Sequence, residues 1–288
     1  MSAEILAGAA LAEDIKADAA RRAEALKNRL GRPACLAIVS AQADAAAQSY
    51  LKARVSACRG AGLETQALPV GPDWNAARLR ALLEGIAKND AIDALIVDFP
   101  LPAGIDAREI REAIPASKDA EGLSPERFGR LFLAKTYAEA SALIVPPTAK
   151  ACAELLRRAK IPLEGRRALV VGRSPVVGRP AAHLLSLLGM TVTLAHSRTL
   201  DLEGEVGRAD AVVAAAGKAR LVRGKWVKKG AAVIDAGVNQ DGPSLRGDVE
   251  FEAAARSASF ITPVPGGVGP VTTACLLANA VLLAEARL

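Results

Sequence analysis

The sequence predicts an α/β fold built from two α/β domains. In each half of the chain, short apolar runs alternate with longer segments of helical period, and this alternation is typical of parallel sheets covered by helices. A glycine-containing turn between an apolar run and a helix, at residues 168–178, indicates a nucleotide-binding type of domain in the second half. The length of 288 residues suits two domains of medium size, and the boundary is expected near Val145.

The first half contains predicted strands and helices in alternation. The strands are short apolar runs. Gly60 and Gly62 indicate the end of one helix, and Asn75 indicates the start of the next. The expected order is a helix at 10–30, a strand at 33–40, a helix at 45–62, a strand at 64–70, a helix at 75–89 and a strand at 93–102.

An irregular segment separates the two halves. Residues 116–142 show no clear period, so a loop-rich connector is expected there. A helix begins near Gly178, and a long apolar helix ends the chain after a loop rich in proline and glycine. The other expected elements of the second half are a helix at 148–161 and strands at 168–171, 191–199, 209–218, 230–239 and near 260.

The composition is that of a globular protein with no sign of a macromolecular partner. Net charge is +6, but the basic residues are scattered and aromatics are only 3%, which argues against nucleic acid and leaves affinity for small anions. The four cysteines are far apart and the two histidines lack ligand-spaced partners, so neither disulfides nor a metal site is expected. No signal peptide or uncharged apolar run of transmembrane length is recognised, so a cytoplasmic protein that does not enter membranes is expected.

The strongest local signal for a ligand is the stretch ALVVGRSPVVGRPAAHLL. Gly172 permits a tight turn after the strand, Gly178 permits close packing of the helix, and the helix N-terminus presents amide hydrogens to a pyrophosphate. The spacing is G-x-S-x-x-x-G and not the common dinucleotide-binding pattern. A strand-to-helix glycine turn without a ligand is the alternative interpretation.

The end of the following strand favours NADP over NAD. NAD sites place Asp or Glu about 20 residues beyond the glycines, whereas here the strand ends in HSRT (196–199), with no carboxylate before Asp201. These groups, together with Arg173 in the glycine turn, suit a 2′-phosphate, which a carboxylate would repel. The alternative is that they are ordinary solvated residues at a strand end.

A set of motifs runs in order along the whole chain. The first half contains QSYLKAR, LIVDFPLP and KDAEGL, and the second contains VVGRSPVVGRPAA, TVTLAHSRT, ADAVVAAAGK, VIDAGVN, GDVEF and ITPVPGGVGPVTTACLLANA. Together they resemble the bifunctional methylenetetrahydrofolate dehydrogenase / methenyltetrahydrofolate cyclohydrolase family, and the segment TPVPGGVGPVT (262–272) is highly specific.

The resemblance implies an architecture and an activity. An N-terminal folate-binding catalytic domain would span 1–145, joined by the final helix at 270–288, and a C-terminal Rossmann-type NADP-binding domain would span 146–269. A cleft between the domains and a homodimer are also implied. The family's dehydrogenase moves a hydride from the methylene carbon between N5 and N10 of tetrahydrofolate to the nicotinamide. Its cyclohydrolase adds water to the resulting methenyl cation and opens the ring.

The resemblance also implies roles for individual residues, with tetrahydrofolate one-carbon derivatives as substrates and NADP as cofactor. The catalytic positions correspond to Tyr50, Arg54 and Asp98. The substrate-binding positions correspond to Tyr50, Val97, Asp98, Phe99, Pro100, Glu121, Pro265, Gly266, Gly267, Val268 and Gly269. The cofactor-binding positions correspond to Gly172, Arg173, Ser174, Val177, Gly178, His196, Ser197, Arg198, Gly217 and Val238.

Three of these positions differ from the family's residues. Arg54 stands where the family has lysine, Asp98 where it has glutamine, and Glu121 where it has the second aspartate of K-D-V-D-G, which binds the pterin. Arginine stays protonated at any working pH, so it is a poor replacement for a lysine that activates water. Because a facing carboxylate would balance its charge, we predict a hydrogen bond between Arg54 and Asp98.

These differences leave several functions open. A dehydrogenase with weak or absent cyclohydrolase activity is favoured, because hydride transfer depends on positioning more than on a base. The alternatives are a fully bifunctional enzyme, an enzyme for a changed pterin substrate, and a non-catalytic folate- and NADP-binding relative.

Overall fold

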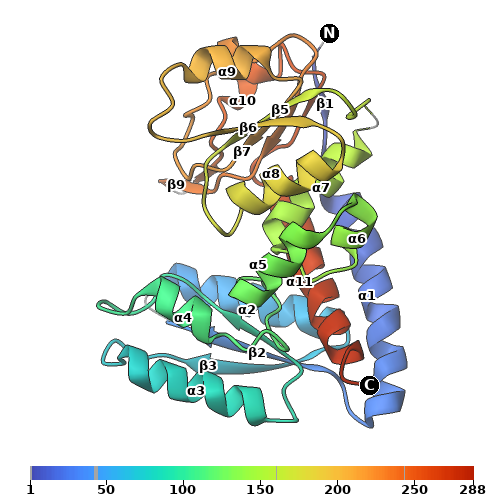
Figure 1. Cartoon of the computed structure of the whole chain (residues 1–288), viewed down its shortest axis with the longest axis vertical. Coiled ribbons are helices and arrows are strands. Elements are labelled where there is room, and N and C mark those ends of the chain that lie inside the picture. Colours follow the sequence, from blue (N-terminus) through green and yellow to red (C-terminus); the bar gives the residue numbers. More distant parts are fainter. Residues whose placement is uncertain (1, 42–44, 160, 243) are drawn as a thin grey trace. The chain divides into compact units, whose positions relative to one another are not determined.

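The described chain divides into two compact units (Figure 1). The computed structural model describes residues 2–41, 45–159, 161–242 and 244–288, except for the side chains of 45–47, 49 and 50. The small-sheet unit comprises Asp14–Leu133, Leu143–Val145 and Thr273–Leu288, and the large-sheet unit comprises the chain up to Glu13, Ala134–Ala142 and Pro146–Thr272. Each unit is an α/β structure with a parallel sheet, which confirms the predicted fold class.

Helices cover both faces of the sheet in the small-sheet unit, whose described strands follow the order β3-β2-β4. Side chains alternate along β2 (Cys35–Ser40). Leu36 and Ile38 pack in a core with α1, α2 and the final helix, while Ala37 and Val39 pack in a second core with α3 and α4. The elements are α1 (Ala9–Leu30), α2 (Ala45–Gly60), β3 (Glu64–Pro69), α3 (Ala76–Lys88), β4 (Ala94–Val97), α4 (Ala107–Ala113) and α5 (Pro125–Leu133).

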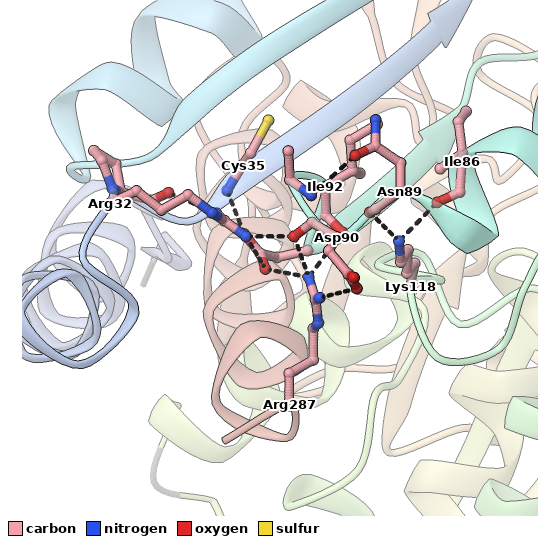
Figure 2. Close-up of polar contacts among 11 residues, drawn as sticks. Arg32, Cys35, Ile86, Asn89, Asp90, Ile92, Lys118 and Arg287 are labelled. Carbon is pink, nitrogen blue, oxygen red and sulfur yellow. Dashed lines mark hydrogen bonds and ion pairs between the residues drawn. The ribbon is translucent and has the colours of Figure 1, made fainter.

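An ion cluster holds together the amino ends of β2 and β4 (Figure 2). The buried Asp93 carboxylate accepts from Arg32 Nη1 at 2.6 Å, from Arg287 Nη1 at 2.6 Å and from the Cys35 amide at 2.8 Å. Lys118 lies beside this cluster, and its Nζ donates to the carbonyls of residues 86 and 89 at 2.7 and 2.6 Å, where α3 ends. Because Arg287 is near the C-terminus, the cluster ties the last residues of the chain to the start of β4.

The large-sheet unit has its described strands in the order β1-β11-β8-β7-β5-β6, all parallel. The chain passes from β5 to β6 on one side and then to β7 on the other, so the order reverses between β5 and β7. Ligands of open α/β sheets bind at the carboxyl ends of strands at such a reversal. The strands are β1 (Glu4–Ile5), β5 (Arg167–Val171), β6 (Thr191–Ala195), β7 (Ala211–Ala214), β8 (Ala232–Asp235) and β11 (Phe260–Ile261).

Helices also cover this larger sheet. Residues of β5, β7 and β8 form a core with α9 and α10, while α8 packs against β5 and β6, and α7 against α8 and β8. A hairpin of β9 (Asn239–Asp241) and β10 (Ser244–Arg246) lies outside the sheet. The helices are α6 (Tyr137–Ser141), α7 (Pro147–Arg158), α8 (Gly178–Leu187), α9 (Leu202–Arg208), α10 (Phe251–Ala254), a 3₁₀ turn (Gly224–Trp226) and α11 (Val268–Glu285), which continues into the small-sheet unit.

The expected loop-rich connector at 116–142 is wrong, because α5 and α6 form within it. Pro125 occupies the first turn of α5, where a missing amide hydrogen costs nothing. Thr136 caps α6 through its hydroxyl, which accepts from the Glu139 amide at 3.1 Å, and Glu139 in turn accepts from the Lys135 amide at 2.8 Å. These capping signals were present in the sequence, but both helices are too short to show a hydrophobic period.

The chain's two ends also depart from expectation. Glu4 and Ile5 add a strand to the large sheet beside β11, so the chain up to Glu13 clusters with that unit, as do residues 134–142. The expectation that no apolar run approaches transmembrane length is wrong for α11, which is long and apolar enough by length and composition. However, 61% of α11 is buried inside the protein, which is typical of a core helix.

Candidate functional site

The glycine turn after β5 has the close approaches that require glycine. Gly172 has φ +116, and a Cβ on it would collide with the Ala215 carbonyl after β7. A Cβ on Gly178 would collide with the Gly172 carbonyl, so the first turn of α8 lies directly against the strand end. The Ser174 hydroxyl accepts from the Val177 amide at 3.1 Å and closes the loop. This arrangement leaves a backbone-lined cradle at the N-terminus of α8, a fit for a dinucleotide pyrophosphate.

The turn after β6 presents basic and hydroxyl groups and no free carboxylate. The Thr199 hydroxyl accepts from the His196 amide at 2.9 Å, and His196 Nδ1 accepts from the Arg198 amide at 3.1 Å. Ser197 and Arg198 are exposed at the tip of this turn. The first carboxylate that follows this turn, Asp201, caps α9 by accepting from the Gly204 amide at 2.8 Å. The turn is therefore suited to a phosphate and not to ribose hydroxyls that need a carboxylate acceptor.

Two buried carboxylates organise the loops after β7 and β8. Asp248 accepts from the amides of residues 216, 217 and 218 at 2.6, 2.8 and 2.9 Å, and from Asn239 Nδ2 at 2.9 Å. Asp235 accepts from the amides of residues 237, 248 and 249, each at 2.9 Å. Burial raises the pKa of Asp235 to about 6 against these hydrogen bonds, and the Asp248 charge adds to that rise. Together they fix the loops that contain Gly217 and Val238.

The loop between β11 and α11 is held in place by contacts of its backbone. Thr262 Oγ1 accepts from the Asp235 amide at 2.8 Å, and the Gly266 carbonyl accepts from the Gly8 amide at 2.8 Å. Gly266 has φ +101, and a Cβ on Gly267 would come within 2.5 Å of the Pro263 carbonyl. Pro265 and Gly266 are exposed, as is Gly269, whereas Gly267 and Val268 are buried.

In the small-sheet unit, the predicted hydrogen bond between Arg54 and Asp98 is confirmed. Arg54 Nη1 donates to Asp98 Oδ1, and the two side chains are only 13% and 20% exposed. Asp98 directly follows β4, so the pair joins the middle of α2 to a carboxyl end of the sheet. Tyr50 belongs to α2, but its side chain lies outside the described residues.

Neighbouring segments complete this region. Phe99 lies under the Arg111 guanidinium of α4, 4.7 Å from the ring centroid, and Pro100 is exposed beside it. Glu121 lies on the segment that runs parallel to β4, and its carboxylate interacts with Arg54 and Asp98. Arg54, Asp98 and Glu121, the three positions that depart from the resemblance, therefore share one charged cluster.

Similarity to known proteins covers the entire chain. Models of the tetrahydrofolate dehydrogenase/cyclohydrolase family match residues 6–121 as its catalytic domain and 146–288 as its NAD(P)-binding domain. The bifunctional protein FolD of Acidiphilium cryptum is 42% identical over 288 residues, which is 100% of both chains. The chain belongs to the tetrahydrofolate dehydrogenase/cyclohydrolase family.

Solved structures of tetrahydrofolate dehydrogenase/cyclohydrolase family members have the same fold. The bifunctional FolD of Campylobacter jejuni has a TM-score of 0.92 at 35% identity, with 100% of both chains covered. The Trypanosoma brucei enzyme, in complex with NADP and an inhibitor, has a TM-score of 0.91 at 34% identity, with 100% of this chain and 99% of that chain covered.

The fold places the predicted family positions in two sets. One set lies in the small-sheet unit and consists of Arg54, Val97, Asp98, Phe99, Pro100 and Glu121. The other set lies in the large-sheet unit. It consists of the residues of the glycine turn after β5, the residues of the turn after β6, Gly217, Val238 and residues 265–269. Within the described residues, no group of three or more His, Cys, Asp or Glu side chains could hold a metal ion.

Sequence reasoning about the tetrahydrofolate dehydrogenase/cyclohydrolase family missed three supporting residues. Asp235 and Asp248 belong to motifs that were recognised, VIDAGVN and GDVEF, yet only the fold brings their carboxylates to the same loops. Asn279 of α11 is buried and donates to the carbonyls of residues 120 and 145 at 2.8 and 2.9 Å. A polar residue in an otherwise apolar helix was the available signal for Asn279.

Proposed function

We propose that the protein is an NADP-dependent 5,10-methylenetetrahydrofolate dehydrogenase that forms 5,10-methenyltetrahydrofolate. Membership of the family over the full length, together with the intact glycine cradle between β5 and α8, carries this proposal. The enzyme of Trypanosoma brucei that binds NADP supports the choice of cofactor. Bound NADP supplies the acceptor for the hydride.

The large-sheet unit is proposed to hold the cofactor. Gly172, Arg173, Ser174, Val177 and Gly178 would hold the pyrophosphate at the N-terminus of α8, with the Arg173 guanidinium as a cation. The side chains of His196, Ser197 and Arg198 would bind the 2′-phosphate. The capping role of Asp201 supports this, because it keeps the carboxylate in the N-cap of α9. Gly217 and Val238 would contact the nicotinamide end.

Residues of the small-sheet unit and residues 265–269 of the large-sheet unit are each proposed to contact the folate. Tyr50 would contact the pterin or aminobenzoate, and Val97, Phe99 and Pro100 would supply apolar contacts after β4. The backbone of 265–269 would approach the ligand closely, which its glycines permit. Arg54 and Asp98 would contact the reacting part of the substrate as a hydrogen-bonded pair.

The cyclohydrolase step cannot use Arg54 as a base. A guanidinium remains protonated at working pH, and Asp98 is engaged by it. Dehydrogenation requires only that the methylene carbon be positioned for hydride loss. A fully bifunctional enzyme is the second candidate, favoured by the bifunctional relatives. A non-catalytic relative that binds folate and NADP is the third.

The wider setting is also proposed from the family and the composition. The protein would work in the cytoplasm on tetrahydrofolate one-carbon derivatives, as a homodimer, without binding nucleic acid or membranes. The scattered basic residues and the sparse aromatics support the statement that the protein does not bind nucleic acid.

The test is a direct assay of cofactor reduction. Protein mixed with NADP and methylenetetrahydrofolate is expected to generate reduced cofactor, followed by its absorbance, and NAD in place of NADP is expected to give a clearly lower kcat/KM. Absence of reduced cofactor at high protein concentration, with folate binding retained in calorimetry, would support the non-catalytic alternative.

A further inference from the structure

The charged cluster of Arg54, Asp98 and Glu121 contains one carboxylate besides that of the Arg54–Asp98 pair, and this carboxylate is a candidate base. A water-activating base must be able to lose and regain a proton near neutral pH. Arg54 cannot do this, and the Asp98 carboxylate accepts the Arg54 guanidinium hydrogen bond. Glu121 is the third member of the cluster.

The backbone places Glu121 beside the end of β4. The Leu95 amide donates to the carbonyl of residue 118 at 2.6 Å, and the Ala120 amide donates to the Leu95 carbonyl at 3.0 Å, a parallel bridge in which Leu95 pairs with Asp119. Glu121 lies two residues beyond Asp119, in the turn that follows this bridge, and Asp98 lies three residues beyond Leu95, directly after β4.

The segment that contains Glu121 is fixed on both sides. Before it, Lys118 is bound to the end of α3 (Figure 2), and the Ala120 carbonyl accepts from the buried Asn279 at 2.8 Å. After it, the Ser124 amide donates to Asp119 Oδ2 at 2.7 Å and closes the loop. The backbone of residue 121 is therefore held next to β4, and Glu121 itself is partly exposed to solvent.

The charges around Glu121 come from three segments. The charge of Arg54 acts on it from α2, that of Asp98 from the residue after β4, and that of Asp119 from its own segment. Burial raises the pKa of Glu121 to about 7, Arg54 opposes the rise, and the two aspartates add to it. Both protonation states of the carboxyl are therefore populated near neutral pH, as proton transfer in both directions requires.

We propose that Glu121 is the proton acceptor of a cyclohydrolase reaction in this protein, in place of the lysine that Arg54 has replaced. This inference rests on the proposed function, since its substrate is the methenyl product of the dehydrogenase.

The proposed step balances without any redox partner. Water forms a C–O bond to the carbon between N5 and N10, and the electron pair of the C=N bond moves to nitrogen. A water proton passes to the Glu121 carboxylate. The C–N5 bond then breaks, Glu121 returns the proton to N5, and the hydroxyl proton is released to solvent to give the formyl group. One cation and one water thus yield neutral 10-formyltetrahydrofolate and one proton.

The test compares both activities in Glu121→Gln. Cyclohydrolase activity is followed as loss of methenyltetrahydrofolate absorbance above the buffer rate, and dehydrogenase activity as reduced cofactor. We expect Glu121→Gln to lower the cyclohydrolase kcat by about 100-fold or more, the contribution typical of a general base, while the dehydrogenase kcat changes far less. Glu121→Asp, which keeps a carboxylate, is expected to retain part of the activity.

The pH profile separates proton transfer from a merely structural role. Because the base must be deprotonated, the wild-type cyclohydrolase kcat is expected to rise with pH through an inflection near 7, and this inflection is expected to disappear in Glu121→Gln. Glu84→Gln, on the exposed side of α3, is the matched control and should leave both activities and the profile unchanged. Thermal unfolding of each variant checks that it is folded.

Three results would overturn the proposal while leaving the dehydrogenase intact. These are a wild-type enzyme with dehydrogenase but no cyclohydrolase activity, a Glu121→Gln variant that keeps its cyclohydrolase, or an equal loss of both activities through the folate KM. The last result would mean that Glu121 only binds the pterin. Absence of dehydrogenase activity in the wild type would instead refute the proposed function itself.

Discussion

At the residue scale, the chemistry of the small-sheet unit depends on which groups Arg54 leaves available. Its hydrogen bond to Asp98 joins two side chains that are largely withdrawn from water. Removing one partner of such a pair leaves a charge without compensation, so each residue constrains what can replace the other. The two positions should therefore be changed together.

A double substitution is expected to restore a lysine-based cyclohydrolase. In Arg54→Lys alone, the lysine would pair with Asp98 and stay protonated, whereas Arg54→Lys with Asp98→Gln would leave it beside a neutral amide. We expect the double variant to exceed the single variant by about tenfold or more in methenyltetrahydrofolate hydrolysis, within the range of general base catalysis. Adding Glu121→Gln to both variants removes the carboxylate route and isolates the lysine. Equal rates in single and double variants would contradict this account of Asp98.

Asp248 is expected to control cofactor binding without touching the folate. An amide in Asp248→Asn would place hydrogens against the donors of residues 216–218, at a cost of about 1–3 kcal/mol for the groups left unsatisfied. The loop that contains Gly217 would loosen, so we expect the KM for NADP to rise by about tenfold, equivalent to about 1.4 kcal/mol, with the folate KM nearly unchanged. Asp241→Asn, in the exposed hairpin, is the control. A folate KM that rises as much as the NADP KM would contradict a local effect.

At the element scale, the structure shows which sequence signals are sufficient by themselves. Asn75 caps α3 by accepting from the Arg78 amide at 2.9 Å, and α3 begins at the next residue, as its pattern predicted. The glycine turn before α8 was also predicted, because glycine at these close approaches has a purely local cause. In contrast, β1 is a strand only because β11, far along the chain, pairs with it. No local pattern contains that information.

The same limit applies to the candidate site. The Arg54–Asp98 contact followed from charge complementarity between two positions that the resemblance placed together. The role of Asp248 depends on hydrogen bonds to loops after two different strands, which only the sheet order brings near it. The sequence thus predicted the residues that belong to a recognised ligand-binding motif. It did not predict residues such as Asp248, which hold in place loops that are distant in the sequence.

The ion cluster at the amino ends of β2 and β4 gives the protein a predictable pH dependence. Burial alone would raise the pKa of Asp93, but the hydrogen bonds from Arg32 and the Cys35 amide, together with Arg287, hold it below its usual value. A carboxyl whose pKa is lowered in the folded state stabilises the protein above its unfolded value of about 3.9, and this stabilisation is lost as the pH falls through the folded pKa. The free energy of unfolding is therefore expected to fall as the pH is lowered from 5 to 3.

Asp93→Asn is expected to remove this pH dependence. At pH 7 the unfolding free energy of the variant should be lower by about 3 kcal/mol. This is the lower end of the range for breaking a buried ion pair, because the Arg32 and Arg287 side chains are partly exposed to solvent. Urea unfolding followed by circular dichroism at each pH measures both effects. Asp90→Asn, which also removes a partner of Arg287 but is 98% exposed, should cost less than about 1 kcal/mol. Similar losses in the two variants would contradict the importance of burial at Asp93.

At the scale of the whole molecule, neither unit is a continuous stretch of chain. The core of the small-sheet unit includes residues of α11, among them Leu276, Leu277 and Val281, next to Leu36 and Ile38 of β2. The large-sheet unit takes its outermost strand, β1, from the start of the chain. Cutting the protein near Val145 would separate each unit from part of its core.

A fragment of residues 1–145 is therefore expected not to fold. It would expose the apolar residues of the core that α11 covers, among them Leu36 and Ile38, and domains are only marginally stable with their cores complete. Urea titration of the fragment should show no cooperative transition, and co-expression with residues 146–288 should recover a soluble complex. A cooperative transition in the isolated fragment would show instead that α11 is dispensable for this unit.

The pairing of Glu4 with Phe260 has a consequence for how the chain is made. A ribosome releases the N-terminus first, and domains generally fold as they emerge. Here the first strand has no partner until β11 has been synthesised, and the sheet around β2 lacks part of its cover until α11 follows. The large sheet therefore gains its strand β1 only after β11 has been synthesised, and the core around β2 is completed only after α11 has followed.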